Sequence, residues 1–150
     1  MLGVLAVVFV AYFKLHPYKN TVLYYANFIS FVSGQKNLSS YELFFDRNTL
    51  RDQHISQYLR AHTQKNDTVF LWGNSAQVYA LTKTLPPGRY TVAYHISNKQ
   101  AITETRQSLE KNPPLYIALF PDQHNFPFVF GGYDYKVTID GIDVYEKRAQ

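Results

Sequence analysis

The sequence contains no cysteine and few charged residues. Without cysteine, disulfide bonds, thiolate nucleophiles and zinc–thiolate sites are excluded. Charged residues make up 17% of the chain, compared with about a quarter in an average protein, while aromatic residues also reach 17%, mainly 13 Tyr and 11 Phe. Tyrosine is typical of surfaces that are apolar along the ring and wet at the hydroxyl, such as membrane interfaces and partner contacts.

The sequence also lacks the spacings of a metal or nucleotide site. Its five histidines show no paired ligand spacing, so no metal site is expected. The corner at Gly73 has one glycine and no following lysine, unlike the glycine-rich loops that hold phosphates. The same corner, Gly73-Asn74-Ser75-Ala76-Gln77, approaches the nucleophile elbow of serine hydrolases but has Gln at its fifth position. We therefore interpret Ser75 as a helix N-cap and expect no catalytic residue and no cofactor in this chain.

Only one long apolar run is present, from Leu2 to Phe13. Twelve helical residues span about 18 Å, little more than half of a bilayer core. The run has no polar face and no cleavage site after it, which argues against a core helix and a signal peptide. The sequence predicts that residues 1–17 are the end of a transmembrane helix, which Pro17 terminates and whose earlier part and partner helices belong to the same protein.

Residues 18–47 are predicted to form amphipathic helices beside the membrane. Aromatic and aliphatic residues recur at helical spacing from Asn20 to Val32, and Gly34 is placed to end that helix. Ser39 to Glu42 has the spacing of a capping box for a second, short helix. The entire net charge of +4 lies in residues 1–65, which suits anionic lipid head groups, although solvated helix faces explain it equally well. A membrane lipid partner is expected, and a nucleic acid is not.

Residues 48–150 are predicted to form a soluble α/β domain. Apolar runs predict strands at 69–72, 89–96 and 115–120, with helices at 50–62, 75–83 and 100–111 between or before them. Ser97 or Asn98 is placed to cap the last of these helices. This alternation predicts three parallel strands in a small three-layer Rossmann-like domain.

The last part of this domain is predicted to be an antiparallel hairpin. Asp140-Gly141 is a strong two-residue turn signal between residues 135–139 and 142–147. Such a turn pairs Ile139 with Ile142 and Val137 with Val144.

Five polar residues follow the predicted strands or precede them, and we expect them to bind a substrate. Loops at the carboxyl ends of parallel strands are where open α/β folds usually hold ligands. The candidates are Asn74, Gln77, Arg89, Asp122 and His124. The alternative is a structural ion pair for Arg89 and ordinary surface polarity for Asp122 and His124.

The order of motifs resembles a family. An apolar helix end and an aromatic helix are followed by Tyr-Glu-Leu-Phe-Phe, then Asn-Asp-Thr-Val-Phe-Leu-Trp-Gly-Asn, Gln-Val-Tyr-Ala-Leu-Thr, Pro-Pro-x-Arg-Tyr and Leu-Glu-Lys-Asn-Pro-Pro-x-Tyr-Ile. This order is similar to the C-terminal soluble domain of bacterial polytopic glycosyltransferases of the GT-C type, related to the protein O-mannosyltransferases and the lipid A aminoarabinose transferase.

The resemblance implies a domain on the extracytoplasmic side of the cell membrane, in an enzyme that transfers a sugar from a polyprenyl-phosphate donor to an acceptor. In that family the proposed base is an acidic residue in the first external loop, and no residue of this chain matches that motif. The competing hypothesis is a membrane-tethered α/β module that binds a ligand or partner without chemistry.

Overall fold

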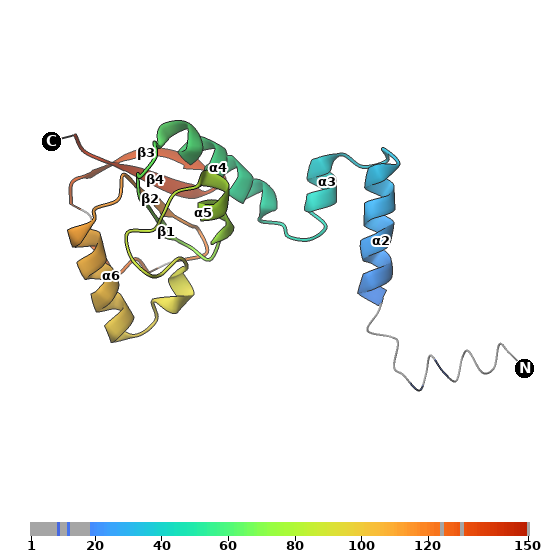
Figure 1. Ribbon diagram of the computed structural model, residues 1–150, viewed down its shortest axis with the longest axis horizontal. Coiled ribbons are helices and arrows are strands. Elements are labelled where there is room, and N and C mark those ends of the chain that lie inside the picture. Colours follow the sequence, from blue (N-terminus) through green and yellow to red (C-terminus); the bar gives the residue numbers. More distant parts are fainter. Residues whose placement is uncertain (1–8, 10–11, 13–18, 124, 130, 150) are drawn as a thin grey trace, which may run out of the picture. The chain divides into compact units, whose positions relative to one another are not determined.

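A computed structural model describes residues 9, 12, 19–123, 125–129 and 131–149 (Figure 1). The predicted end of a transmembrane helix, residues 1–17, lies outside these residues except for Phe9 and Tyr12. In the described part of the chain, no helix is long and apolar enough to cross a membrane. The chain divides into two compact units, Met1–Leu50 and Arg51–Gln150, which we call unit 1 and unit 2.

Unit 1 contains helices α2 (Lys19–Val32) and α3 (Leu38–Glu42). The turn after α2 places Gly34 at φ 77°, where its N–H donates to the carbonyl of Phe31, as expected for a glycine that ends a helix. The predicted capping box at Ser39 is wrong. The side chain of Asn37 caps α3 instead, accepting from the Ser40 N–H at 2.8 Å. Because this amide oxygen satisfies a free N–H of the first turn, the helix begins at Leu38, and Ser39 lies inside it.

The described residues of unit 1 pack through aromatic rings rather than through a buried core. Phe31 stacks on Tyr41 with ring centroids 4.6 Å apart, and Tyr41 meets the edge of Phe45 at 5.2 Å. The one buried residue in this part of the chain is polar: Asn27 donates to the carbonyl of Tyr41 at 3.1 Å and accepts from Lys36 at 2.8 Å. This amide joins α2 to the last turn of α3 and to the loop between them.

Unit 2 is built on a mixed sheet of four strands in the order β1-β2-β4-β3. The strands are β1 (Val69–Trp72), β2 (Tyr116–Leu119), β3 (Tyr133–Ile139) and β4 (Ile142–Lys147). Only β1 and β2 are parallel, and β4 pairs antiparallel with both β2 and β3. The predicted hairpin is confirmed, with Ile139 opposite Ile142 and Val137 opposite Val144.

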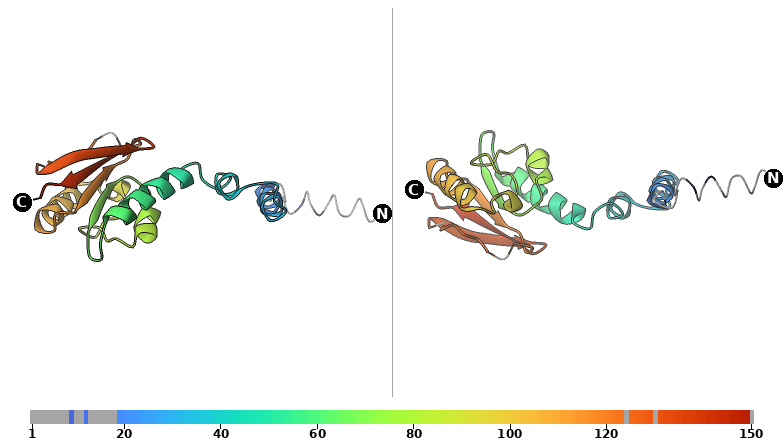
Figure 2. Two further views of the ribbon diagram at one scale, coloured as in Figure 1. Left: turned by 90° about the horizontal axis from the view of Figure 1, so that it is seen from above. Right: turned by 90° about the horizontal axis from the view of Figure 1, so that it is seen from below.

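Helices cover both faces of the β1–β2 pair (Figure 2). Alternate residues of β1 point to opposite faces, so Val69 and Leu71 pack with α4 (Thr49–His62) and α5 (Gln77–Thr82). Phe70 and Trp72 point to the other face, where α6 (Lys99–Lys111) lies. All four residues of β1 are buried, which explains why the sequence shows a continuous apolar run. Of the two predicted cap residues, Asn98 caps α6 by accepting from the Ala101 N–H at 2.9 Å.

The predicted strand at Arg89–Ile96 is wrong, and the sheet has one parallel pair instead of three parallel strands. The segment bonds the chain just after β1, where the Ala93 N–H donates to the carbonyl of Gly73, and residues Ala93–His95 form a 3₁₀ turn, η2. Val92 is buried beside Ala93, and the residues that pack with the cluster on the α6 face are Tyr90, Ala93 and Ile96. Their spacing of three fits one turn of 3₁₀ helix rather than the alternation of a strand.

Candidate functional site

The corner between β1 and α5 lies at the carboxyl end of the parallel pair and depends on Gly73. A Cβ at this position would lie 2.4 Å from the ring of Phe120, which follows β2, so only glycine allows the two strand ends to approach. The carbonyl of Gly73 accepts from Ala93 at 2.8 Å, and the side chain of Asn74 accepts from the Tyr94 N–H at 3.1 Å. The corner is therefore fixed on its outer side by the segment that contains η2.

A buried ion pair on α4 lies against the same corner. Asp52 is 1% exposed, and its carboxylate accepts from Arg51 Nε at 3.2 Å and from Gln77 Nε2 at 2.7 Å. The guanidinium of Arg51 also donates to the hydroxyl of Ser75 at 3.2 Å and lies 3.7 Å from Asp122. Its carbon lies 5.0 Å from the centre of the Phe120 ring, a cation–π distance. We call Arg51, Asp52, Asn74, Ser75, Gln77 and Asp122 the polar edge.

The structure brings three of the five predicted site residues together at this edge: Asn74, Gln77 and Asp122. Arg89 lies away from this edge, and its guanidinium is 3.6 Å from the carboxylate of Glu104 on α6. This contact is the structural ion pair given above as the alternative to a binding role. His124 lies outside the described residues. Because Asn74 uses its carbonyl oxygen for Tyr94 and is exposed, its amide N–H groups face solvent at the edge.

Ser75 has a different role from the predicted one. Residue Ala76 occupies the N-cap position of α5, and no side chain accepts a hydrogen bond there. The hydroxyl of Ser75 instead accepts a hydrogen bond from the guanidinium of Arg51, which lies on α4. Among the described residues, no histidine hydrogen-bonds Ser75, and no group of three His, Asp or Glu side chains is arranged to hold a metal ion. The polar edge thus has the groups to bind a polar ligand but no nucleophile with its base.

Arg51 and Asp52 were missed by reasoning from sequence. A signal was present: Asp52, Ile55, Ser56 and Leu59 fall at the spacing of one helix face, and all four are buried. An acid on the apolar face of a helix requires a partner when that face is buried, and Arg51 and Gln77 supply it. The pairing of Arg51 with Asp122 could not be read from the sequence, because it joins residues from distant segments.

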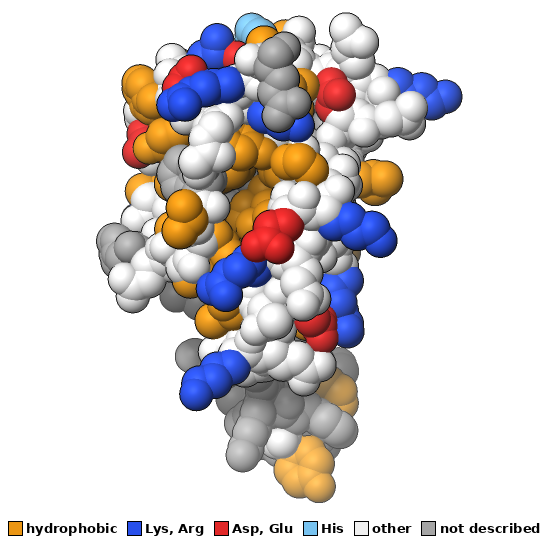
Figure 3. Space-filling model, turned by 90° about the vertical axis from the view of Figure 1, so that its left-hand side faces the viewer, with side chains coloured by type: hydrophobic (Ala, Val, Ile, Leu, Met, Phe, Trp, Pro, Cys, Tyr) orange, Lys and Arg blue, Asp and Glu red, His pale blue; other side chains and the backbone are white. Residues whose placement is uncertain are grey.

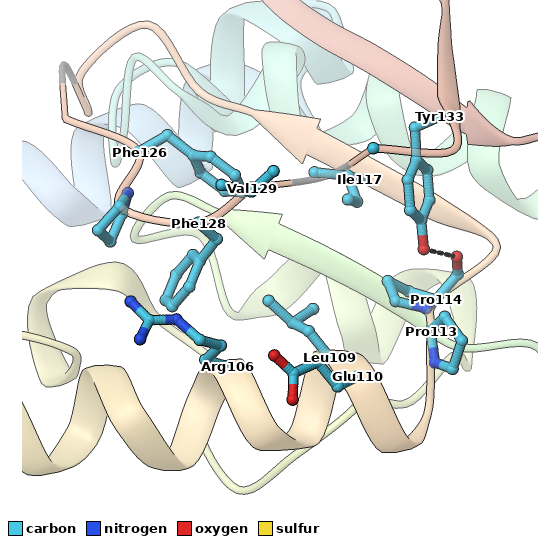
Figure 4. A pocket seen from close by; sticks show the side chains of 12 residues that line it. Arg106, Leu109, Glu110, Pro113, Pro114, Ile117, Phe126, Phe128, Val129 and Tyr133 are labelled. Carbon is cyan, nitrogen blue, oxygen red and sulfur yellow. Dashed lines mark hydrogen bonds between the residues drawn. The ribbon is translucent and has the colours of Figure 1, made fainter.

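A second site lies on the other face of the sheet, between α6 and the segment that precedes β3. It is a pocket of about 480 Å³, which we call the α6 pocket (Figure 4). Figure 3 views unit 2 from this side and shows hydrophobic side chains in a hollow between charged ones. The lining is mostly apolar, with charges contributed by α6. Its residues are Arg106, Leu109, Glu110, Pro113, Pro114, Ile117, Phe126, Pro127, Phe128, Val129, Gly131 and Tyr133.

Two aromatic groups fix the walls of the α6 pocket. Tyr133 donates its hydroxyl to the carbonyl of Pro114 at 2.6 Å, and burial raises its pKa to about 12, so the hydroxyl stays protonated. Phe126 and Phe128 meet the ring of Trp72 edge to face, with centroids 5.6 and 5.7 Å away. The buried indole N–H of Trp72 has no hydrogen-bond partner in the described part of the chain.

The chain was compared with protein families, curated proteins and solved structures. None of the three comparisons gives a match.

Proposed function

We propose that this chain is the C-terminal extracytoplasmic domain of an integral-membrane glycosyltransferase that uses a polyprenyl-phosphate-linked sugar, and that its polar edge recognises the acceptor. One observation carries the proposal. Polar side chains from α4, from the corner after β1 and from the loop after β2 converge at the carboxyl end of a parallel strand pair. This is the position at which α/β sheets hold their ligands.

The chemistry of the edge favours recognition over reaction. Sugar hydroxyls are bound by amide groups, which donate and accept hydrogen bonds, and by carboxylates, which accept them. Asn74 offers free amide donors, while Arg51 and Asp52 are held by each other and by Gln77, so they act as a rigid support. The transfer step is assigned to the membrane part of the protein, in accordance with the resemblance noted in the sequence.

Unit 1 supports the membrane assignment. Along α2 and the segment after it, large apolar side chains face solvent, and Val22, Tyr25, Ile29 and Val32 are among the most exposed. Contiguous exposed apolar surface marks a contact with a membrane or a partner. Unit 1 also carries a net charge of +2, half of the +4 held by residues 1–65, and anionic head groups attract such an excess.

The fold fits a reduced form of the expected Rossmann-like domain. We propose that the chain shares one part with that fold, namely the parallel pair β1–β2 with helices on both faces. The antiparallel pairing of β4 with β2 occupies the edge where another parallel strand would lie.

The test is a transfer assay on membranes from cells that express the complete gene product. A radiolabelled polyprenyl-phosphate sugar is the donor, and transfer to endogenous acceptors is measured. We expect transfer with the complete product, and a loss of about tenfold in Asn74→Asp, which keeps the acceptor oxygen for Tyr94 but removes the amide donors at a cost of roughly one good hydrogen bond.

The matched control is Asn98→Asp. Asn98 also accepts a backbone hydrogen bond through its side-chain oxygen, at the start of α6, and aspartate is an equally good N-cap. Full transfer is expected in this variant. Absence of transfer by the complete product would refute the glycosyltransferase, whereas equal transfer by Asn74→Asp and Asn98→Asp would refute the acceptor site.

A membrane-tethered binding module is the second candidate. The observation that favours it is the mutual pairing of the charges at the polar edge, since Arg51 contacts two carboxylates and a hydroxyl and has little freedom to act on a substrate. The same transfer assay separates the two. A complete product without donor-dependent transfer that still binds a glycan or protein through the Asn74 corner would establish the module.

A further inference from the structure

The α6 pocket carries an inference that does not depend on the polar edge. Its volume of about 480 Å³ lies in the range of roughly 300–1,000 Å³ that specific ligand sites occupy. The floor is Ile117 of β2, and Phe128 forms a wall that is itself 6% exposed, so the apolar lining is held in place by the core of unit 2. Val129 at the rim is 99% exposed, which is unusual for a valine beside a pocket.

The rim of the pocket has one cation and one anion without partners. Arg106 and Glu110 lie one helical turn apart on α6 and are both exposed. Neither makes a hydrogen bond or an ion pair with the described residues. Four other cations of unit 2, Arg51, Arg89, Lys136 and Arg148, have carboxylate partners.

These charges restrict the occupant. An anionic amphiphile would gain from Arg106 but would be repelled by Glu110, and a cationic one would meet the reverse. A polypeptide segment with a large apolar side chain and charged residues of both signs beside it satisfies both rim charges and fills the apolar lining. The positions of the two charged side chains in Figure 4, beside the apolar walls on the α6 side, fit such a segment lying along the helix.

We propose that the α6 pocket binds an extended polypeptide segment in which an apolar anchor is flanked by one acidic and one basic residue. The anchor lies against Leu109, Phe128 and Val129, the acidic residue pairs with Arg106, and the basic residue pairs with Glu110. The contact with Trp72 through Phe126 and Phe128 makes this pocket observable, because Trp72 is the only tryptophan of the chain.

The experiment titrates the full 150-residue chain with two capped peptides and follows the fluorescence of Trp72. The peptides are Asp-Leu-Phe-Lys and its charge-exchanged form, Lys-Leu-Phe-Asp. We expect both to bind and one to be preferred by a factor on the order of ten, the combined effect of two exposed ion pairs. In the double variant Arg106→Glu with Glu110→Arg, the preference should change to the other peptide. A peptide with Ser-Ser in place of Leu-Phe should not bind.

The controls use residues that leave the fold unchanged. Lys99→Glu reverses a charge on α6 outside the pocket and should leave both affinities unchanged. Val129→Ser removes an exposed side chain from the rim and should weaken both peptides equally, by about threefold, since it removes part of the apolar contact alone.

Three results would overturn the proposal. The first is no change in fluorescence with either peptide at millimolar concentration. The second is a preference that the double variant does not change. The third is tighter binding of dodecyl phosphate than of both peptides, strengthened further in Glu110→Arg, which would make the pocket a site for an anionic amphiphile.

Discussion

The two units of this chain bury their apolar residues to very different extents. Unit 2 encloses two apolar clusters, one on each face of the sheet, with Ile55, Val69 and Ala118 among its fully buried residues. In the described part of unit 1 the only buried residue is Asn27, while Phe28 and Ile29 beside it are 46% and 64% exposed. The same kinds of side chain thus stabilise unit 2 internally and remain available for an external contact in unit 1.

This difference separates stability from association. A buried aromatic ring contributes to folding because it leaves water on folding, whereas an exposed ring contributes only when a lipid or another protein covers it. Substitutions in unit 2 should therefore change the free energy of unfolding, and substitutions on α2 should change binding to membranes instead.

The largest effect is expected from a pair of matched phenylalanine substitutions. Phe70→Ala removes a ring of the edge strand β1 that is 2% exposed and packed in the cluster on the α6 face, and it should lower the free energy of unfolding by about 3–5 kcal/mol in a urea titration of the 150-residue chain. Phe28→Ala should change it by less than about 0.5 kcal/mol, because that ring is already half exposed.

In a membrane-binding assay we expect the opposite order, with the larger loss in Phe28→Ala. Sedimentation with phosphatidylcholine vesicles that contain phosphatidylglycerol should fall in Phe28→Ala and stay unchanged in Phe70→Ala measured at a temperature where it is folded. Equal unfolding losses in the two variants, or equal vesicle binding, would remove the distinction between the units.

The polar edge should be almost as important to the stability of unit 2 as its core. Asp52→Ala leaves the guanidinium of Arg51, which is 15% exposed, without its closest carboxylate, and the loss of a buried partner costs about 3 kcal/mol or more. Asp122 is 47% exposed, and Asp122→Ala should cost less than about 1 kcal/mol. Chemical denaturation of the two variants measures this contrast. A larger loss in Asp122→Ala than in Asp52→Ala would contradict the supporting role assigned to the Arg51–Asp52 pair.

A smaller loss is expected at the glycine of the corner. In Gly73→Ala the new Cβ meets the ring of Phe120, so the backbone or the ring has to move, at a cost of about 1–3 kcal/mol. Gly131→Ala is the control, since nothing lies within 4 Å of a Cβ at that position. Melting temperatures compare the two, and an unchanged value in Gly73→Ala would show that the strand ends are not closely packed.

Several of these features could be predicted from sequence because their signals are local. The hairpin follows from Asp140-Gly141, β1 from a run of four apolar residues, and the α6 cap from Asn98. The segment Arg89–Ile96 was misassigned because β-branched and aromatic residues suggest a strand, while Tyr90, Ala93 and Ile96, which pack on the α6 face, have the spacing of a 3₁₀ turn.

The site could be predicted only in part for the same reason. Asn74 and Gln77 follow a strand that the sequence reveals, so their place at the edge was expected. Arg51 reaches Asp122 across the fold, and the α6 pocket is assembled from a helix, a proline corner and a loop, so neither has a local pattern.

The smallest predicted effect is a pH dependence in the sheet of unit 2. The hydrogen bond from Lys136 holds the pKa of Glu146 below its usual range, with a further contribution from the Tyr116 hydroxyl. Because the pKa is lowered in the folded state, the stabilisation is present above the usual value of 4.5 and is lost as the pH falls through the folded value. In Glu146→Gln the free energy of unfolding should fall less steeply as the pH is lowered below 4.5. Added salt should weaken this pH dependence in the unchanged chain. A pH dependence unchanged by this substitution would exclude the pair as its source.

The most direct measurement of the central claim is the acceptor dependence of sugar transfer by the complete gene product carrying Asn74→Asp, with Asn98→Asp measured beside it. The account predicts that Asn74→Asp raises the KM for the acceptor by about tenfold, the size of one lost hydrogen bond, while the KM for the polyprenyl-phosphate donor and the melting temperature stay at the values of Asn98→Asp. An unchanged acceptor KM, or a rise in both KM values together with a lower melting temperature, would contradict a recognition site at the polar edge.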